Sequence, residues 1–147
     1  MTSTPAGNTQ RQKWMEIYAV YQKDFIEARD KFHEAKTSLP AHPSDGMPKG
    51  NAKSDPTARL YERYDKAYAR YCHALAAMNT AYTKRMAAMQ PLDKDQKKVL
   101  ELRFFKQMSR RQTAKELGKS QTWVRCRERT GLFLLEIPSG WETDILP

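Results

Sequence analysis

The amino-acid sequence predicts an all-α fold, in which a long N-terminal helical hairpin is followed by a C-terminal helix-turn-helix. Two long segments carry apolar residues at alternating steps of four and three, and a segment rich in proline and glycine separates them. The last third carries capping residues and a glycine at the spacing of two short helices joined by a tight turn. A hydrophobic fraction of 39% and a mean hydropathy of −0.84 fit amphipathic helices better than a sheet.

The first long helix is expected at about residues 10–37, after a small polar N-terminus, residues 1–9, that we expect to be disordered. Its apolar positions form a heptad seam. They are Trp14, Tyr18, Tyr21, Phe25, Ala28, Phe32 and Ala35. Three prolines and two glycines in residues 39–55 exclude a regular element there and predict a loop.

The second long helix is expected from Pro56 to about Met89, since proline suits the first turn of a helix. Its seam positions are Leu60, Tyr64, Ala67, Tyr71, Ala74, Met78 and Ala81. A second row, which includes Tyr61, Tyr68 and Tyr82, makes this apolar face wide enough to cover more than one helix. Residues 10–90 therefore predict an antiparallel hairpin that serves oligomerisation or contact with a partner.

Three short helices are expected in residues 91–137. Asp93 is placed to cap the first, at about 94–105, and Ser109 is placed to cap the second. Gly118 can take the left-handed conformation that ends the second helix, and Ser120 can then cap a third helix at about 121–135. The tail, residues 138–147, contains Trp141, Ile145 and Leu146, which can dock on the body of the protein.

The charge of the chain favours a polyanionic partner. The net charge is +9 and the pI is about 9.6, and residues 91–135 hold twelve Lys and Arg against five Asp and Glu. Counterion release stabilises binding of such a surface to nucleic acid, but charge alone does not separate DNA from RNA or from an anionic membrane. The basic excess is densest around the two capped helices, and their helix-turn-helix spacing favours double-stranded DNA as the partner.

The third short helix has two faces of different chemistry. Val124 and Leu135 lie on the side expected to pack inward, and Gly131 on that side permits close approach of another helix. The base-reading candidates on the opposite side are Gln121, Thr122, Arg125 and Cys126. Arg can bind guanine, Gln can bind adenine, and the Thr methyl can contact thymine in the major groove. The candidate phosphate contacts are Arg110, Arg111, Lys115, Lys119 and Arg129.

The sequence does not favour an enzyme. No paired carboxylates, nucleophile with a base, metal-ligand cluster or phosphate-binding loop stands out, so we expect no catalytic residue, no metal site and no cofactor. Cys72 and Cys126 form no ligand or disulfide pattern and are expected to be reduced thiols. No apolar run long enough for a membrane span and no signal peptide is visible, so we expect a cytoplasmic protein without membrane contact.

From about Pro91 to Leu135 the chain resembles region 4 of sigma-70-type factors. The resemblance is carried by LDKDQKKVLELRFF and by MSRRQTAKELGKSQTWVR, with Ala114, Leu117 and Gly118 on the standard positions of the motif. It implies recognition of a −35 promoter element by the candidate base-reading residues, and RNA polymerase as a candidate partner. Thr113, Lys119 and Arg127 differ from the aliphatic residues that the family usually has at these positions.

A second resemblance covers Pro43–Tyr64. The segment PSDGMPKGNAKSDPTARLYERY is similar to one in phage transcriptional regulators of the RinA/ArpU-like type, in which a helical region precedes a sigma-region-4-like end. This resemblance implies an activator of phage or prophage late genes in a bacterial host cell, associated with the nucleoid. A homodimer formed through the N-terminal helices would then bind a two-fold related operator.

Two other functions remain open on the sequence. A DNA-packaging protein similar to a small terminase subunit also joins a helix-turn-helix to helical oligomerisation segments, although its DNA-binding part usually comes first. An RNA-binding antiterminator could stack bases on aromatic residues. Buried packing, however, accounts better for Phe25, Tyr64 and Tyr71 on the heptad faces. We therefore expect a sequence-specific transcriptional regulator.

Overall fold

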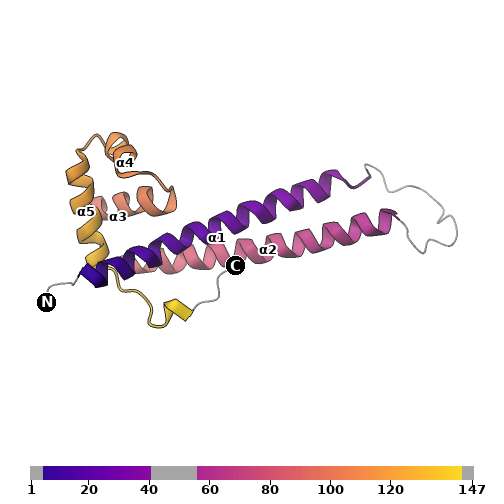
Figure 1. Ribbon diagram of the computed structural model, residues 1–147, viewed down its shortest axis with the longest axis horizontal. Helices are drawn as coiled ribbons and strands as arrows, with labels where there is room; N and C mark the ends of the chain where they lie inside the picture. The colour runs from indigo at the N-terminus through magenta and orange to yellow at the C-terminus, as the bar shows by residue number, and fades with distance from the viewer. Residues whose placement is uncertain (1–4, 41–55, 144–147) are drawn as a thin grey trace. The chain divides into compact units, whose positions relative to one another are not determined.

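The computed structural model describes residues 5–40 and 56–143, which divide into two compact units. One unit contains the chain up to Gln22 and from Met78 onward, and the other contains Lys23–Ala77. The described ranges form helices and no strand (Figure 1), which confirms the all-α prediction. The α-helices are α1 (Pro5–Thr37), α2 (Pro56–Ala88), α3 (Lys94–Leu100), α4 (Arg110–Leu117) and α5 (Gln121–Leu134).

The first helix begins at Pro5, before the expected start near residue 10. Residues 5–9, which we expected to be disordered, are helical, and residues 1–4 lie outside the described residues. Arg11 donates a hydrogen bond from Nε to the carbonyl oxygen of Leu135 at 3.0 Å, and Trp14 and Met15 are buried. These tertiary contacts stabilise the early turns of α1, and hydrophobic periodicity along the sequence does not reveal them.

The second helix begins at Pro56, as expected, and most of the expected loop, residues 41–55, lies outside the described residues. Within the unit Lys23–Ala77 the two helices run antiparallel. Asp24 pairs with Arg70 at 3.0 Å, whereas Glu34, further along α1, pairs with Arg63, earlier on α2, at 3.1 Å. The order of these pairs shows the hairpin arrangement directly.

The heptad seam of this unit is filled by aromatic and alanine side chains. Phe32 stacks on Tyr71 with 5.1 Å between ring centroids, and Phe25 lies 5.6 Å from the same ring. Ala28, Ala35 and Ala74, which alternate with aromatic residues along the two seams, are buried. Small and large side chains therefore alternate along the seam, which lets the two helices approach closely.

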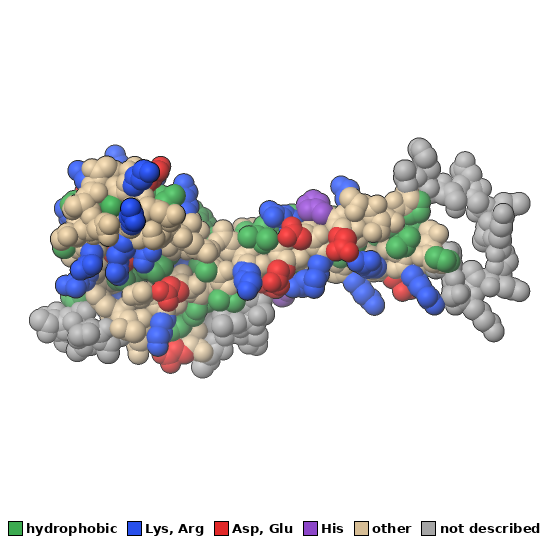
Figure 2. Space-filling model, turned by 45° about the horizontal axis from the view of Figure 1, so that its top comes forward, with side chains coloured by type: hydrophobic (Ala, Val, Ile, Leu, Met, Phe, Trp, Pro, Cys, Tyr) green, Lys and Arg blue, Asp and Glu red, His purple; other side chains and the backbone are tan. Residues whose placement is uncertain are grey.

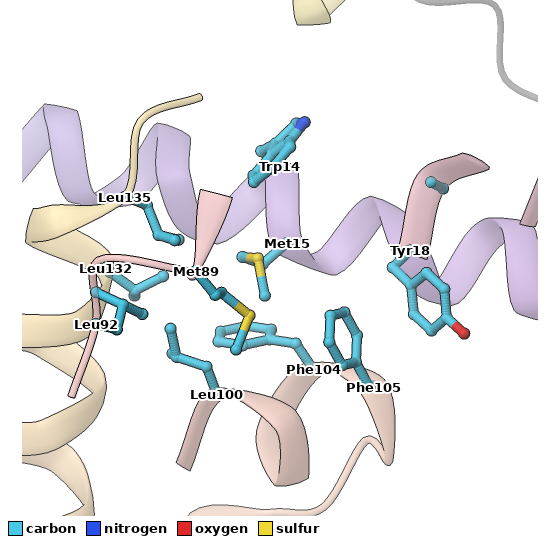
Figure 3. Packing of buried hydrophobic residues seen from close by; sticks show 11 residues of the cluster. Trp14, Met15, Tyr18, Met89, Leu92, Leu100, Phe104, Phe105, Leu132 and Leu135 are labelled. Carbon is cyan, nitrogen blue, oxygen red and sulfur yellow. The ribbon is translucent and has the colours of Figure 1, made fainter. Parts of the chain in front are cut away.

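The core of the other unit is built from α1, the end of α2 and the helices on either side of α4. Figure 3 shows side chains from α1, from the end of α2 and from the C-terminal helices converging around Met15 and Met89, both fully buried. The buried members are Trp14, Met15, Tyr18, Ala81, Met89, Leu92, Leu100, Phe104, Phe105, Leu132 and Leu135. The start of α1 and the end of α2 therefore complete the core of the C-terminal helices.

This unit also contains a π-helical turn after α3 and a tail that packs against its core. The helix expected at 94–105 is α-helical to Leu100 and continues as a π-helical turn, Glu101–Phe105, with Lys106 donating its backbone N–H to Glu101. In the tail, Ile137 and Trp141 pack against the core, whereas Ile145 and Leu146 lie outside the described residues. No helix in the described part of the chain is long and apolar enough to cross a membrane.

Candidate nucleic-acid interface

The three C-terminal helices begin at side-chain caps. The side chains of Asp93 and Ser109 accept the backbone N–H groups of Gln96 at 2.8 Å and Gln112 at 3.1 Å. Each glutamine side chain in turn accepts the backbone N–H of its capping residue, which makes two reciprocal capping boxes. Ser120 caps α5 by accepting the N–H of Trp123 at 3.1 Å. All three expected caps are therefore present.

The turn between α4 and α5 depends on Gly118. Its φ of 66° and ψ of 34° are left-handed, a conformation that glycine adopts without a steric penalty. The N–H of Lys119 then reaches the carbonyl of Ala114 at 2.9 Å, and the N–H of Gly118 reaches that of Lys115 at 3.3 Å. These two bonds form a Schellman motif, which ends α4 and turns the chain directly into α5.

The inner face of α5 packs on α3 and α4. Val124 is fully buried with Val99 and Ala114, and Leu117 and Trp123 pack against this cluster. A Cβ atom at Gly131 would lie 3.2 Å from Cδ1 of Leu100, so α5 and α3 approach closely at this glycine. Thr113, which differs from the aliphatic residue usual in sigma region 4, is fully buried with its hydroxyl donating to the carbonyl of Ser109 at 2.9 Å.

A buried carboxylate joins α5 to the helices that precede it. Glu128 is 3% exposed, and its Oε1 accepts a hydrogen bond from Nε of Arg103. Its Oε2 accepts from Nη2 of Arg110 at 2.8 Å and from Nε at 3.2 Å. Arg103 also donates from Nη1 to the carbonyl of Met108 at 2.6 Å. This network fixes α5 against the start of α4 and the preceding loop.

The outward face of α5 carries the four candidate base-reading residues. Gln121, Thr122, Arg125 and Cys126 are all exposed, and they lie on the first two turns of the helix. The first turns of a recognition helix are the part that reaches base edges in the major groove. Their exposure agrees with a reading role, and that role remains a prediction.

The candidate phosphate contacts fall into three groups. Arg111, Lys115 and Arg129 are exposed. Lys119 is exposed with its Nζ 5.4 Å from the ring centroid of Trp123. Arg110 differs, because Glu128 binds its guanidinium group through Nε and Nη2. In Figure 2, Lys and Arg side chains gather over the part of the molecule formed by α4 and α5.

Sequence reasoning missed several residues that support this surface. Gln96 and Gln112 complete the capping boxes, and the spacing of an Asp or Ser followed three residues later by Gln predicts this role. Trp123, half-buried, has the guanidinium of Arg127 5.4 Å from its ring centroid, which accounts for a cation where the family usually has an aliphatic residue. No local signal could pair Arg103 with Glu128 across 25 positions.

Candidate metal ligands do not cluster in the part of the chain that the structure describes. Among residues 5–40 and 56–143, no group of three or more His, Cys, Asp or Glu could hold a metal ion. Cys72 and Cys126 are free and exposed.

Comparison with known protein families supports a helix-turn-helix in the C-terminal part of the chain. Residues 88–135 match the family described as Sigma-70, region 4. No curated protein and no solved structure matches the chain. The matched segment spans α3, α4 and α5, with their caps and the Gly118 turn. The C-terminal part of the chain is therefore a sigma-region-4-like helix-turn-helix, which is a DNA-binding domain.

Proposed function

We propose that the protein is a sequence-specific DNA-binding transcriptional regulator, with α5 as the helix that enters the major groove. The observation that carries the proposal is the outward face of α5. It is polar and exposed, and the inner face of the same helix is fixed by Val124, Glu128 and Gly131. A rigid helix with an unobstructed polar face can present several side chains to base edges in one register.

The base-reading and phosphate-binding roles divide by position on this surface. Arg125 and Gln121 have forked side chains that can bind guanine and adenine in two places at once, and Thr122 and Cys126 can contact smaller groups. Arg111, Lys115, Lys119 and Arg129 flank them and supply contacts to phosphates, which position the helix without reading sequence. Arg110 contributes in part by orienting α4 through Glu128.

The proposal extends to a phage or prophage late-gene activator that works in the bacterial cytoplasm with RNA polymerase. The resemblance of residues 43–64 to phage regulators supports this context, and the match to sigma region 4 supports promoter DNA as the target. The hairpin unit Lys23–Ala77 is the proposed surface for a homodimer or for the polymerase. Its exposed Ile26, Tyr61 and Tyr68 support that role.

Fluorescence anisotropy tests DNA recognition directly. The full chain is titrated against duplexes from its own genomic neighbourhood and against scrambled duplexes, at several salt concentrations. We expect one segment to bind more tightly than its scrambled control, with a ratio that persists as salt rises, because base contacts depend less on salt than phosphate contacts do. Equal binding of all duplexes would contradict sequence-specific recognition.

A transcription assay tests the activator role. Host RNA polymerase and a promoter that contains the identified segment are combined with and without the protein. We expect more full-length transcript when the protein is present, and no increase from a promoter with the segment scrambled. A decrease in transcript would indicate a repressor and would contradict activation while leaving DNA recognition intact.

A further inference from the structure

The first turns of α1 lie against the recognition helix. Arg11 donates from Nε to the carbonyl oxygen of Leu135, at the C-terminal end of α5, and its guanidinium lies 6.0 Å from the ring centroid of Phe133. One turn later, Trp14 and Met15 enter the same core as Leu132 and Leu135. The start of α1 is therefore held beside the C-terminal half of α5 by a hydrogen bond and by buried apolar contacts.

An open pocket of about 250 Å³ lies between these two helices and the start of α4. Its polar lining residues are Asn8, Thr9, Gln12, Arg110, Arg125 and Arg129. Glu128 also lines it, but its carboxylate is engaged by Arg103 and Arg110. Three arginines against one compensated carboxylate give the pocket an excess of positive charge, and polar side chains of α1 form its opposite wall.

We propose that this pocket binds a backbone phosphate of DNA, so that the first turns of α1 form part of the DNA interface. The proposal rests on the proposed DNA-binding function. Arg129, on the exposed side of α5, lines the pocket one helical turn after Arg125, the residue proposed to read a base. Arg110 uses Nε and Nη2 for Glu128, so Nη1 is not part of that pair. Arg110 and Arg129 therefore line one pocket from two helices, and guanidinium groups suit a phosphate group, which accepts several hydrogen bonds.

The position of the pocket also fits a phosphate better than a base. A recognition helix inserts its first turns into the major groove, and the groove is bordered by phosphates on either side. The proposed base-reading residues, Arg125 at the edge of the pocket included, lie on the first two turns of α5, whereas Arg129 lies beyond them and lines the pocket together with residues of α1. The start of α1 lies outside residues 88–135, so this contact adds to those of the region-4-like segment.

Charge substitutions at Thr9 test the proposal, with matched controls at Thr83. Thr9 is exposed on α1 and lines the pocket, and Thr83 is exposed on α2 and does not line it. The variants are Thr9→Lys, Thr9→Glu, Thr83→Lys and Thr83→Glu in the full chain, each checked for unchanged thermal unfolding. Affinity for the preferred duplex and for a scrambled duplex is measured by anisotropy over a series of salt concentrations.

We expect Thr9→Lys to tighten binding to both duplexes severalfold, and to steepen the salt dependence by about 0.9 in the log–log slope, as one added phosphate contact does. Thr9→Glu should weaken binding to both duplexes by a similar factor. The Thr83 variants have the same net charges and should change affinity much less. If the variants at the two positions behave alike, the pocket does not contact DNA and the inference is overturned.

The design separates this inference from the proposed function. A wild-type protein that prefers its own duplex, together with Thr9 variants that match their Thr83 controls, would overturn only the phosphate pocket. A Thr9 response on both duplexes, without any preference of the wild type for one of them, would overturn only sequence-specific recognition.

Discussion

Glu128 on α5 and Arg110 at the start of α4 form an ion pair with 2.8 Å between Oε2 and Nη2, and the carboxylate is nearly inaccessible to water. Arg103 binds the second oxygen of the same carboxylate. The pair therefore links the two helices of the motif at a point where an uncompensated charge would be costly. Arg110, a predicted phosphate contact, therefore also has a structural role through its ion pair with Glu128.

Replacement of Glu128 by Gln should destabilise the fold by about 2–3 kcal/mol. Removing one partner of a fully buried ion pair costs ~3–5 kcal/mol. We expect a smaller loss here, because the Arg110 side chain is 40% exposed and water can solvate its guanidinium group once the carboxylate is removed. Urea unfolding followed by circular dichroism measures the change. Glu116→Gln, on the exposed side of α4, is the control and should change stability by less than about 0.5 kcal/mol. Equal stability of both variants would show that the network contributes little.

Gly131 permits the approach of α5 to α3, and a larger side chain there should disrupt it. Gly131→Val should lower stability by about 1–3 kcal/mol, because the added atoms would overpack the contact with Leu100, which is fully buried. Gly131→Ala should be much milder, since alanine gains about 1 kcal/mol in helix propensity and this offsets the 3.2 Å contact. Thermal unfolding of the two variants is the measurement, and a valine variant as stable as the alanine variant would contradict close packing.

Arg125 and Lys115 should differ in the kind of DNA binding that they support. Arg125→Ala should cost roughly 1–3 kcal/mol at one base position and relax specificity there, whereas Lys115→Ala should weaken binding evenly and reduce the salt slope by about one. Binding to a set of duplexes with single base changes separates these outcomes. Lys66→Ala is the control, since Lys66 is exposed on α2 in the unit Lys23–Ala77, away from the helix-turn-helix in sequence, and its loss should change binding less. An even loss on every duplex for Arg125→Ala would remove it as a base-reading residue.

Alkaline pH should weaken the fold in part through Tyr18. Burial raises the pKa of its phenol above the ordinary value of 10.0, Tyr82 raises it further, and Arg85 opposes them. The folded state therefore holds the phenol proton more tightly than the unfolded chain does. The stability that this difference contributes is complete below pH 10 and is lost as pH rises through the pKa of the folded state. Tyr18→Phe keeps the ring that packs edge-on against Phe105 and removes the titrating group.

The free energy of unfolding, measured by urea at several pH values above 9, tests this prediction. We expect it to fall less steeply with pH in Tyr18→Phe than in the wild type. Tyr61→Phe, at a 39% exposed position, is the control and should follow the wild type. A Tyr18→Phe profile that coincides with the wild-type profile would show that Tyr18 does not contribute to the alkaline loss of stability.

The tail should contribute to stability through Trp141. Its half-buried ring packs against the core, so Trp141→Ala should lower the free energy of unfolding by about 1–3 kcal/mol through lost apolar burial. Leu134→Ala provides a control, since that side chain is 45% exposed and its removal should cost less. Urea unfolding compares them. A smaller loss for Trp141→Ala than for Leu134→Ala would mean that the tail does not stabilise the core.

Much of the local structure of the C-terminal part was predictable from short stretches of sequence. Asp93, Ser109 and Ser120 lie at the three helix starts, and Gly118 takes the left-handed turn, because these preferences act between residues a few positions apart. The start of α1 was predicted five residues too late. Its first turns are stabilised by Leu135 and by the core, and no local signal reports contacts with residues more than a hundred positions away.

The sequence by itself determined the helical fold class, the heptad seams, the helix caps and the chemistry of the outward face of α5, since all of these depend on residue type and helical spacing. The tertiary structure alone decided which distant residues meet. It joined the start of α1 and the end of α2 to the core of the C-terminal helices, paired Glu128 with Arg103 and Arg110, and placed Thr9 and Arg129 around one pocket. Such contacts depend on how whole helices pack against one another, and the spacing of residues within each helix leaves that packing open.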